Sequence, residues 1–326
     1  MKRACLLCLL GLLTLLLTGC AGGTENPSAG EMYEDFITVG FSQVGAESDW
    51  RNANTQSMKE ALSEENGFRL ILDDAQQKQE RQITAIRNFI QQEVDYIVLA
   101  PTKETGWDTV LAEARAAGIA VIVVDRMIEV QDGDLFTCWV GSDFRAEGDT
   151  AVEWMERYAG DRPLRIVHLQ GSMGSSAQIG RTAALDEALK RHENWTLVTR
   201  ESGEFTLAKG QELMEAVLEQ GLAFDVVYSE NDNMTYGVID ALQAAGRQPG
   251  KDVIILSFDA SHRALEMMLE GKISLDVECN PLHGPRVRAL IEQLEAGNVP
   301  AKLTFVEETF FEAETLTRQT LDAREY

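Results

Sequence analysis

The sequence has few cysteines and histidines, and this scarcity argues against several kinds of site. There are five cysteines and four histidines in 326 residues. Cys5 and Cys8 lie in the leucine-rich N-terminal run, and no cysteines beyond it have the Cys-x-x-Cys spacing of redox and zinc motifs; no two histidines have the helical spacing of metal ligands. A nucleophile–base arrangement and a dinucleotide-binding glycine motif are also absent. We therefore expect no enzymatic activity, no cofactor and no metal site.

Positive charge is also scarce. The chain has 29 lysines and arginines against 53 aspartates and glutamates, which gives a formal net charge of −24. So acidic a chain is repelled by phosphate backbones, and we expect no nucleic-acid partner. The same charge favours solubility beside an anionic surface.

The N-terminal residues have the pattern of a secretory signal. Lys2 and Arg3 precede a leucine-rich run, residues 6–17, that is too short to span a bilayer. The ending Leu17-Thr18-Gly19-Cys20 resembles a bacterial lipobox, which implies that residues 1–19 are removed and that Cys20 carries a diacylglycerol. The alternative is an ordinary signal with a chance cysteine. Residues 20–35 are rich in Gly, Pro and Ser, which predicts a lipid-anchored linker.

Two cysteines remain beyond this region, Cys138 and Cys279. A secreted protein could form one disulfide bridge between them. Neither has a partner nearby in sequence, and we expect two buried, free thiols.

Short apolar runs alternate with amphipathic segments in two successive halves of the chain. In the first half the expected strands are residues 36–41, 68–72, 96–100 and 119–124, and the expected helices are 50–65, 83–90 and 110–117. In the second half the expected strands are 165–169, 195–198, 224–228, 253–258 and 273–277, and the expected helices are 177–191, 207–219, 234–245 and 264–269. Continuous apolar strands between helices indicate parallel sheets buried on both faces. We predict an α/β protein with two doubly wound lobes and a cleft between them.

Polar residues follow several of the expected strands. They include residues 43–51, Asp125 and Arg126, residues 230–232 and Asp259. Ligands of open parallel sheets bind beyond the carboxyl ends of the strands, so this clustering predicts a binding site there.

Several of these segments resemble a known family. The stretches FSQVGAESDWR (41–51), DAQQKQERQITAIRNFI (74–90), APTKETGW (100–107), VVDR (123–126), END (230–232) and SFDA (257–260) are similar to the periplasmic galactofuranose-binding proteins of ABC transporters, a branch of the ribose-binding-protein type. The resemblance covers nearly all of residues 36–310. It implies a periplasmic binding protein-like fold of type I, with two lobes joined by a three-segment hinge. The implied N-terminal lobe comprises 36–143 and 280–308, and the C-terminal lobe 144–279 and 309–326.

The resemblance also implies a set of ligand-binding residues. These are Glu47, Ser48, Trp50, Arg51, Asp125, Arg126, Arg181, Phe205, Asn231 and Asp259. Carboxylates accept hydrogen bonds from sugar hydroxyls, guanidinium groups donate to hydroxyl and ring oxygens, and aromatic rings stack on C–H faces. Either Glu278 or Cys279 corresponds to a further contact of ribose-binding relatives, and the sequence leaves this open.

Taken singly, some of these residues have simpler interpretations. Asn231-Asp232 could cap the following helix, and Trp50 could be a core residue at a helix start. The turn at residues 171–175 lacks the lysine of a phosphate-binding loop, so we interpret it as a tight turn and helix cap.

We therefore expect a monomeric, extracytoplasmic solute-binding lipoprotein, held at the cell membrane by its N-terminal lipid. It would capture a monosaccharide, with galactofuranose or a related furanose or pentose as the first candidate, and deliver it to the permease subunits of an ABC importer. The alternative is a sugar-sensing module for a membrane kinase or chemoreceptor. A transcription repressor with this core would need a helix-turn-helix in place of the signal and linker.

Overall fold

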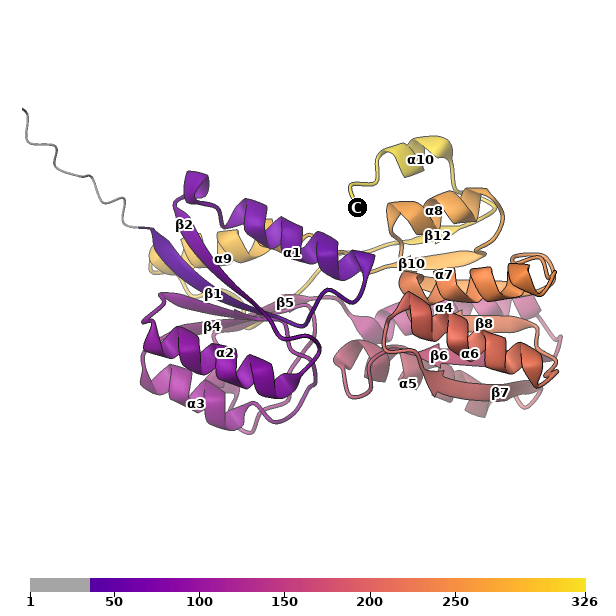
Figure 1. Cartoon of the computed structure of the whole chain (residues 1–326), viewed down its shortest axis with the longest axis horizontal. Helices are drawn as coiled ribbons and strands as arrows, with labels where there is room; N and C mark the ends of the chain where they lie inside the picture. Colours follow the sequence, from indigo (N-terminus) through magenta and orange to yellow (C-terminus); the bar gives the residue numbers. More distant parts are fainter. Residues whose placement is uncertain (1–35) are drawn as a thin grey trace, which may run out of the picture. The chain divides into compact units, whose positions relative to one another are not determined.

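A computed structural model describes residues 36–326 of the chain (Figure 1). The predicted signal peptide 1–19, with the linker 20–35 and Cys20, lies outside the described residues. Within residues 36–326, no helix combines the length and the apolar character needed to cross a membrane.

The first sheet has six strands, all paired in parallel. Their order is β11-β5-β4-β3-β1-β2. The strands are β1 (Ile37–Gln43), β2 (Phe68–Asp74), β3 (Tyr96–Leu99), β4 (Ala120–Val124), β5 (Cys138–Gly141) and β11 (Leu303–Phe305). Helices α1 (Asp49–Ala61) and α9 (Gly284–Glu295) cover one face, and α2 (Gln79–Gln91) and α3 (Asp108–Ala116) cover the other (Figure 1). This is the doubly wound layer that the sequence predicts.

The second sheet also has six strands, in the order β12-β10-β9-β8-β6-β7. The strands are β6 (Leu164–Gln170), β7 (Trp195–Ser202), β8 (Val226–Ser229), β9 (Ile254–Asp259), β10 (Leu275–Glu278) and β12 (Phe310–Glu312). Its helices are α4 (Phe144–Ala159), α5 (Ser176–Arg191), α6 (Leu207–Glu219), α7 (Asp232–Ala244), α8 (His262–Leu269) and the short α10 (Arg318–Asp322). The expectation of an all-parallel sheet is wrong at one edge, because β12 pairs with β10 antiparallel. Doubly wound sheets often carry one antiparallel edge strand.

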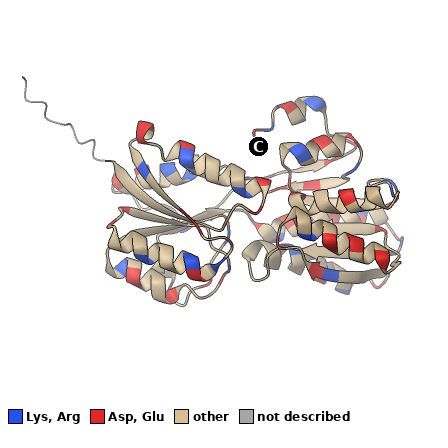
Figure 2. Ribbon diagram, viewed as in Figure 1, with Lys and Arg blue, Asp and Glu red and all other residues tan. Residues whose placement is uncertain are grey.

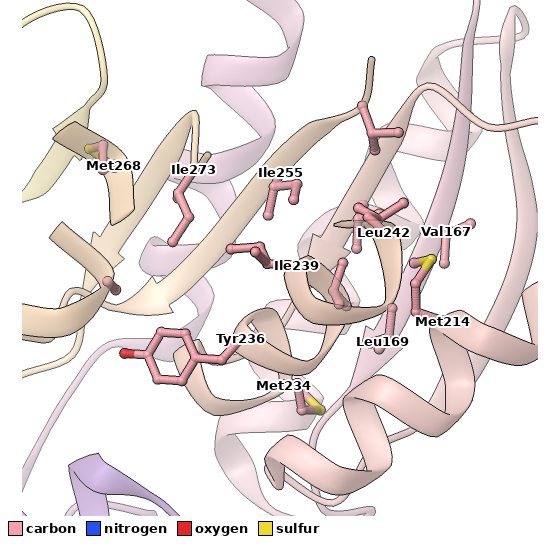
Figure 3. Packing of buried hydrophobic residues seen from close by; sticks show 14 of the residues in the cluster. Val167, Leu169, Met214, Met234, Tyr236, Ile239, Leu242, Ile255, Met268 and Ile273 are labelled. Atoms are coloured by element: carbon pink, nitrogen blue, oxygen red, sulfur yellow. The ribbon is translucent and has the colours of Figure 1, made fainter. Parts of the chain in front are cut away.

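Apolar side chains of the strands fill the core on both faces of each sheet. In the second sheet, Tyr236, Ile239 and Leu242 of α7 pack in the same cluster as Val167 and Leu169 of β6 (Figure 3). Met214 of α6 and Ile255 of β9 complete the layer. The polar ends of the strands are thereby held on a rigid support.

Three chain segments connect the two sheets. They run from β5 to α4, from β10 to α9 and from β11 to β12. Glu308 in the third segment joins all three, because its Oε1 accepts hydrogen bonds from Ser142 Oγ (2.7 Å) and from the backbone N–H of Asn280 (2.6 Å). The lobe limits given above stay a prediction.

Charged residues lie mainly along the helices of both lobes (Figure 2). Many form exposed pairs, such as Arg87 Nε with Glu113 Oε2 at 2.8 Å. Exposed pairs of this kind contribute little to stability.

The two remaining cysteines are buried free thiols, as predicted. Cys138 lies on β5 in the core of the first lobe, and Cys279 follows β10.

Candidate ligand-binding site

All ten residues predicted for the site line one cavity between the two lobes. Glu47, Ser48, Trp50, Arg51, Asp125 and Arg126 come from the N-terminal lobe. Arg181, Phe205, Asn231 and Asp259 come from the C-terminal lobe. The structure therefore brings together every residue of the set, from segments more than two hundred positions apart.

On the N-terminal side, one arginine connects two carboxylates. Arg51 Nε donates to Glu47 Oε1 at 3.1 Å, and Arg51 Nη1 donates to Asp125 Oδ2 at 2.8 Å. All three side chains are buried. The second oxygen of Glu47, Oε2, is buried without a hydrogen-bond partner. A ligand hydroxyl at this oxygen would satisfy it.

Asp125 and Arg126 both face the cavity although they are neighbours in sequence. Neighbouring side chains of a regular strand point to opposite faces, so an extended strand would not bring both into one site. The strand β4 ends at Val124, and Asp125 has φ = 63°, a left-handed conformation that is rare for non-glycine residues. This bend turns both side chains into the cavity, with Arg126 Nε 3.9 Å from Asp125 Oδ2.

Arg126 is a buried cation with weak protein partners. Its nearest hydrogen-bond acceptor is the Thr102 carbonyl at 3.5 Å. Burial, together with the charge of Arg51, lowers the pKa of Arg126 to about 10. Arg126 therefore has N–H groups that could donate hydrogen bonds to a ligand oxygen.

Two aromatic rings form apolar walls. Trp50 Nε1 donates to the Cys279 carbonyl at 2.6 Å, which fixes the indole across the two lobes. The Phe205 ring lies 5.2 Å from the Arg126 guanidinium carbon. Gly171 makes room for this ring, since a Cβ at position 171 would lie 1.9 Å from Phe205 Cζ.

On the C-terminal side, Arg181 is held by three neighbours. Its Nε donates to Glu147 Oε2 at 2.7 Å, its Nη1 donates to the Glu230 carbonyl, and its guanidinium stacks over Phe258 at 4.8 Å. Nη2 lies 3.9 Å from Asp259 Oδ1, a gap that a ligand oxygen could bridge.

Two of the predicted residues also cap helices. The Asn231 Oδ1 accepts the N–H of Met234 at the start of α7, and the Ser48 Oγ accepts the N–H of Arg51 at the start of α1. The capping interpretation of Asn231 is therefore confirmed, and it coexists with a position on the cavity wall.

Asp259 lies in a strained turn. It has φ = 110°, and Ala260 follows with φ = 53°. Such backbone costs free energy and is concentrated at functional sites. Burial, reinforced by the nearby charge of Asp232, raises the pKa of Asp259 well above its ordinary value.

Three further residues line the cavity, namely Phe144, Ala177 and Cys279. Of the two candidates at the end of β10, Glu278 and Cys279, the second is therefore the one on the wall. Glu278 accepts a hydrogen bond from Arg324 Nη1 at 2.8 Å. Phe144 and Ala177 were not predicted, because an apolar residue in a polar site has no distinguishing pattern.

A cluster of acidic groups lies behind Arg181. The ligand atoms of Glu147, Cys279 and Glu308 are within 4.8 Å of one another, close enough to surround a metal ion. The Arg181 guanidinium beside Glu147 already balances one negative charge there. That the protein uses no metal stays a prediction.

The lobes also touch at the rim of the cavity. Met127 N–H donates to Ser176 Oγ at 2.8 Å, and Asp49 N–H donates to Asn233 Oδ1 at 3.0 Å. Both bonds join the N-terminal lobe to the C-terminal one, so the structure is closed around the site.

Comparison with known proteins identifies the family. Residues 39–281 match the model of a periplasmic binding protein domain. The chain is 39% identical to the galactofuranose-binding protein YtfQ of Escherichia coli (strain K12), over 86% of this chain and 89% of the relative.

Solved structures agree. A crystal structure of a galactofuranose binding protein has a TM-score of 0.84 at 38% identity and covers 89% of this chain and 98% of its own. The periplasmic binding protein of the arabinose ABC transporter from Shewanella sp. ANA-3, bound to α- and β-L-arabinofuranose, has a TM-score of 0.82 at 38% identity, with coverages of 89% and 99%. The chain belongs to the periplasmic binding protein family.

Proposed function

We propose that this protein captures a furanose monosaccharide outside the cytoplasm and delivers it to an ABC importer. The observation that carries the proposal is the closed, polar cavity, whose walls combine charged hydrogen-bonding groups with two aromatic rings. The relatives named above bind galactofuranose and arabinofuranose, which supports the furanose class.

The charges of the cavity favour a neutral ligand. Its walls hold three arginines, Arg51, Arg126 and Arg181, and three acidic residues, Glu47, Asp125 and Asp259. A charged ligand of either sign would therefore meet groups of its own sign on the cavity wall. A neutral polyol satisfies both, because each hydroxyl donates to one group and accepts from another.

The aromatic walls of the cavity favour a sugar ring as the ligand. Trp50 and Phe205 would cover the C–H faces of the ring.

The class of sugar can be tested by titration calorimetry with equilibrated D-galactose and L-arabinose, and with myo-inositol as a polyol that has no ring oxygen. The ring form can be read from the anomeric carbon resonance of bound ¹³C-labelled sugar. We expect binding of at least one of the two reducing sugars, in the furanose form. Binding of the pyranose form alone would contradict the furanose assignment, and no binding of either sugar would contradict the ligand class.

The delivery step has its own test. Deletion of the gene should abolish uptake of the bound sugar, and deletion of the partner permease should have the same effect. If uptake is unchanged while sugar-dependent gene expression is lost, the protein is a sensing module instead.

The N-terminal anchor is proposed on the motif ending at Cys20. A thioether-linked diacylglycerol would hold a monomeric protein at the membrane while the two lobes stay in water. Cys20→Ala should release the protein from the membrane fraction or block its maturation. A variant that matures and fractionates like the wild type would rule out the anchor.

A further inference from the structure

Two buried carboxyl groups beneath the turn at Asp259 have no role in the site described so far. Asp232 begins α7 and Asp276 lies in β10, where it is paired in register with Ser257 of β9. The two side chains are 1% and 0% exposed. Within residues 36–326, neither forms a salt bridge with a basic side chain. Two adjacent negative charges would be very unfavourable in such a place.

Asp232 has the bonding pattern of an ionised carboxylate. Its Oδ1 accepts from Ser257 Oγ at 2.7 Å, and its Oδ2 accepts from the N–H and the Oγ of Ser261 at 2.9 and 2.7 Å. Two more hydroxyls extend the network, since Thr235 Oγ1 lies 2.8 Å from Ser257 Oγ and Tyr236 OH lies 2.7 Å from Ser261 Oγ. Each of these series of hydroxyl groups can end in an O–H that donates to a carboxylate oxygen of Asp232.

Asp276 has a different pattern. Its Oδ1 accepts the N–H of Ala260 at 3.0 Å, whereas its Oδ2 is buried and receives no N–H or O–H. Asp232 and Asp276 lie close enough for each carboxyl to shift the pKa of the other. Two buried carboxyl groups this close are favourable only when one of them holds a proton, and the oxygen that receives no donor is the one that can carry it.

These two carboxyls hold the turn that carries Asp259. Asp276 binds the N–H of Ala260 and Asp232 binds the N–H of Ser261. Arg324, near the C-terminus, donates to the carbonyls of Asp259 and Ala260. The strained φ angles of this turn are therefore fixed from three sides.

We propose that Asp276 is a positioning residue for the site, a neutral carboxylic acid that donates its proton to Asp232 and holds the turn that aims Asp259 at the sugar. The effect on sugar affinity rests on the proposed function, whereas the location of the proton on Asp276 does not.

The charged groups around the pair support this arrangement. Asp259 faces it from the end of β9, Tyr236 from α7, and Arg324 from the C-terminal segment, where its guanidinium is engaged by Glu278 and by backbone carbonyls. Arg181 contacts Asp259 rather than the pair, and Arg263 lies over the Tyr236 ring. Burial, followed by the charge of Asp232, raises the pKa of Asp276 well above its ordinary value.

The proton is tested by Asp276→Asn. An amide keeps both the acceptor for Ala260 and a donor for Asp232, but cannot ionise. Unfolding of the wild type at about pH 7 releases the proton of Asp276, and unfolding of the variant should release about one proton fewer. The measurement is the slope of unfolding free energy against pH, compared between the two proteins. Equal slopes would overturn the assignment of the proton.

The positioning role is tested by affinity for equilibrated D-galactose or L-arabinose, whichever the wild type binds. Asp276→Asn should stay within about twofold of the wild type, and Asp276→Ala should lose on the order of tenfold, since the N–H of Ala260 is then left unpaired. A fall in wild-type affinity at alkaline pH should be smaller in Asp276→Asn. The role is contradicted if Asp276→Asn loses as much affinity as Asp276→Ala, or if Asp276→Ala loses none.

The two variants keep the tests separate. If Asp276→Ala does not fold, the affinity and pH profile of Asp276→Asn still decide the matter. If the wild type binds no sugar, the proposed function fails, and the proton count on unfolding still decides where the proton lies.

Discussion

Arg126 shows how a single residue can serve binding at the expense of stability. Its guanidinium is buried, and its nearest acceptor is 3.5 Å away. Replacing a poorly paired buried charge by an apolar side chain of similar length often stabilises a protein. In this position the same charge would donate to the sugar.

We therefore expect Arg126→Met to move affinity and stability in opposite directions. Loss of charge-assisted hydrogen bonds of about 1.5–3 kcal/mol should weaken sugar binding roughly ten- to a hundredfold. The melting temperature of the sugar-free protein should be unchanged or rise by a few degrees. Calorimetric titration and thermal unfolding measure the two effects.

Arg87→Met is the matched control, because Arg87 forms only an exposed pair far from the cavity. It should leave the affinity unchanged. An Arg126→Met variant that binds sugar as tightly as the wild type would remove Arg126 from the site.

Asp259 gives a second test at this scale, with an acidic side chain in place of a basic one. Its carboxylate has no hydrogen-bond donor closer than the Arg181 guanidinium, at 3.9 Å, among the side chains of residues 36–326. Asp259→Asn should weaken binding by about tenfold or more, since the amide can accept fewer hydroxyls. Asp225→Asn is the control, because Asp225 pairs with Arg165 on the surface. Equal affinities in all three proteins would contradict the role of Asp259.

Residue types alone could identify the polar part of the site, because Asp, Arg and Asn at strand ends are unusual and the family resemblance selects among them. They could not identify Phe144 or Ala177, which look like core residues. Nor could they identify Asp276, since the sequence Leu-Asp-Val-Glu of β10 reads as an alternating strand with one face in water. Its burial depends on α7, a partner more than thirty residues away.

At the scale of elements, the strand–helix alternation predicted most of the strands of both sheets but missed two long helices, α4 (Phe144–Ala159) and α9 (Gly284–Glu295). Helix α6 has the predicted limits 207–219. The strands β5, β11 and β12 were also missed, and the three residues of β11 are exposed. The chain reaches β12 directly from β11 of the first sheet. The antiparallel direction of β12 therefore depends on how the chain crosses between the lobes, which no local sequence pattern encodes.

The turn after β6 offers a test of how elements meet at the site. Gly171 lies directly against the Phe205 ring, which comes from the turn between β7 and α6. Gly171→Ala should displace this ring, lower the stability by about 1–3 kcal/mol and weaken sugar binding. Gly133→Ala, at a glycine with open space around it, should change neither.

The double variant Gly171→Ala with Phe205→Ala shows whether the ring is the cause. Removing the ring should recover part of the stability lost in Gly171→Ala, since the clash disappears. If the effects of the two substitutions simply add, the proposed contact does not explain the loss.

At the scale of the whole molecule, we expect sugar binding to be coupled to closure of the two lobes. Contacts such as Met127 N–H to Ser176 Oγ exist only when the lobes approach. Saturating sugar should therefore reduce the radius of gyration measured by small-angle scattering. An unchanged radius would contradict closure by sugar.

Two acidic residues near the segments that connect the lobes, Glu308 and Glu147, predict how stability depends on pH. Burial, with the charge of Glu147, raises the pKa of Glu308 to about 8, and burial raises the pKa of Glu147 to about 7. A raised folded-state pKa means that the folded protein holds protons that the unfolded chain has released. Stability should therefore fall as pH rises from about 5 toward 8, and this part of the dependence should level off above the folded pKa values.

Glu308→Gln keeps an acceptor for Ser142 and Asn280 but cannot ionise, so its stability should fall less steeply over this range. The exposed Glu113→Gln should keep the wild-type slope. Chemical denaturation at a series of pH values measures all three proteins, and identical slopes would mean that Glu308 is already ionised at neutral pH. Because Glu308 links the three segments that connect the lobes, a smaller slope would also show that the hinge carries a proton in the closed protein.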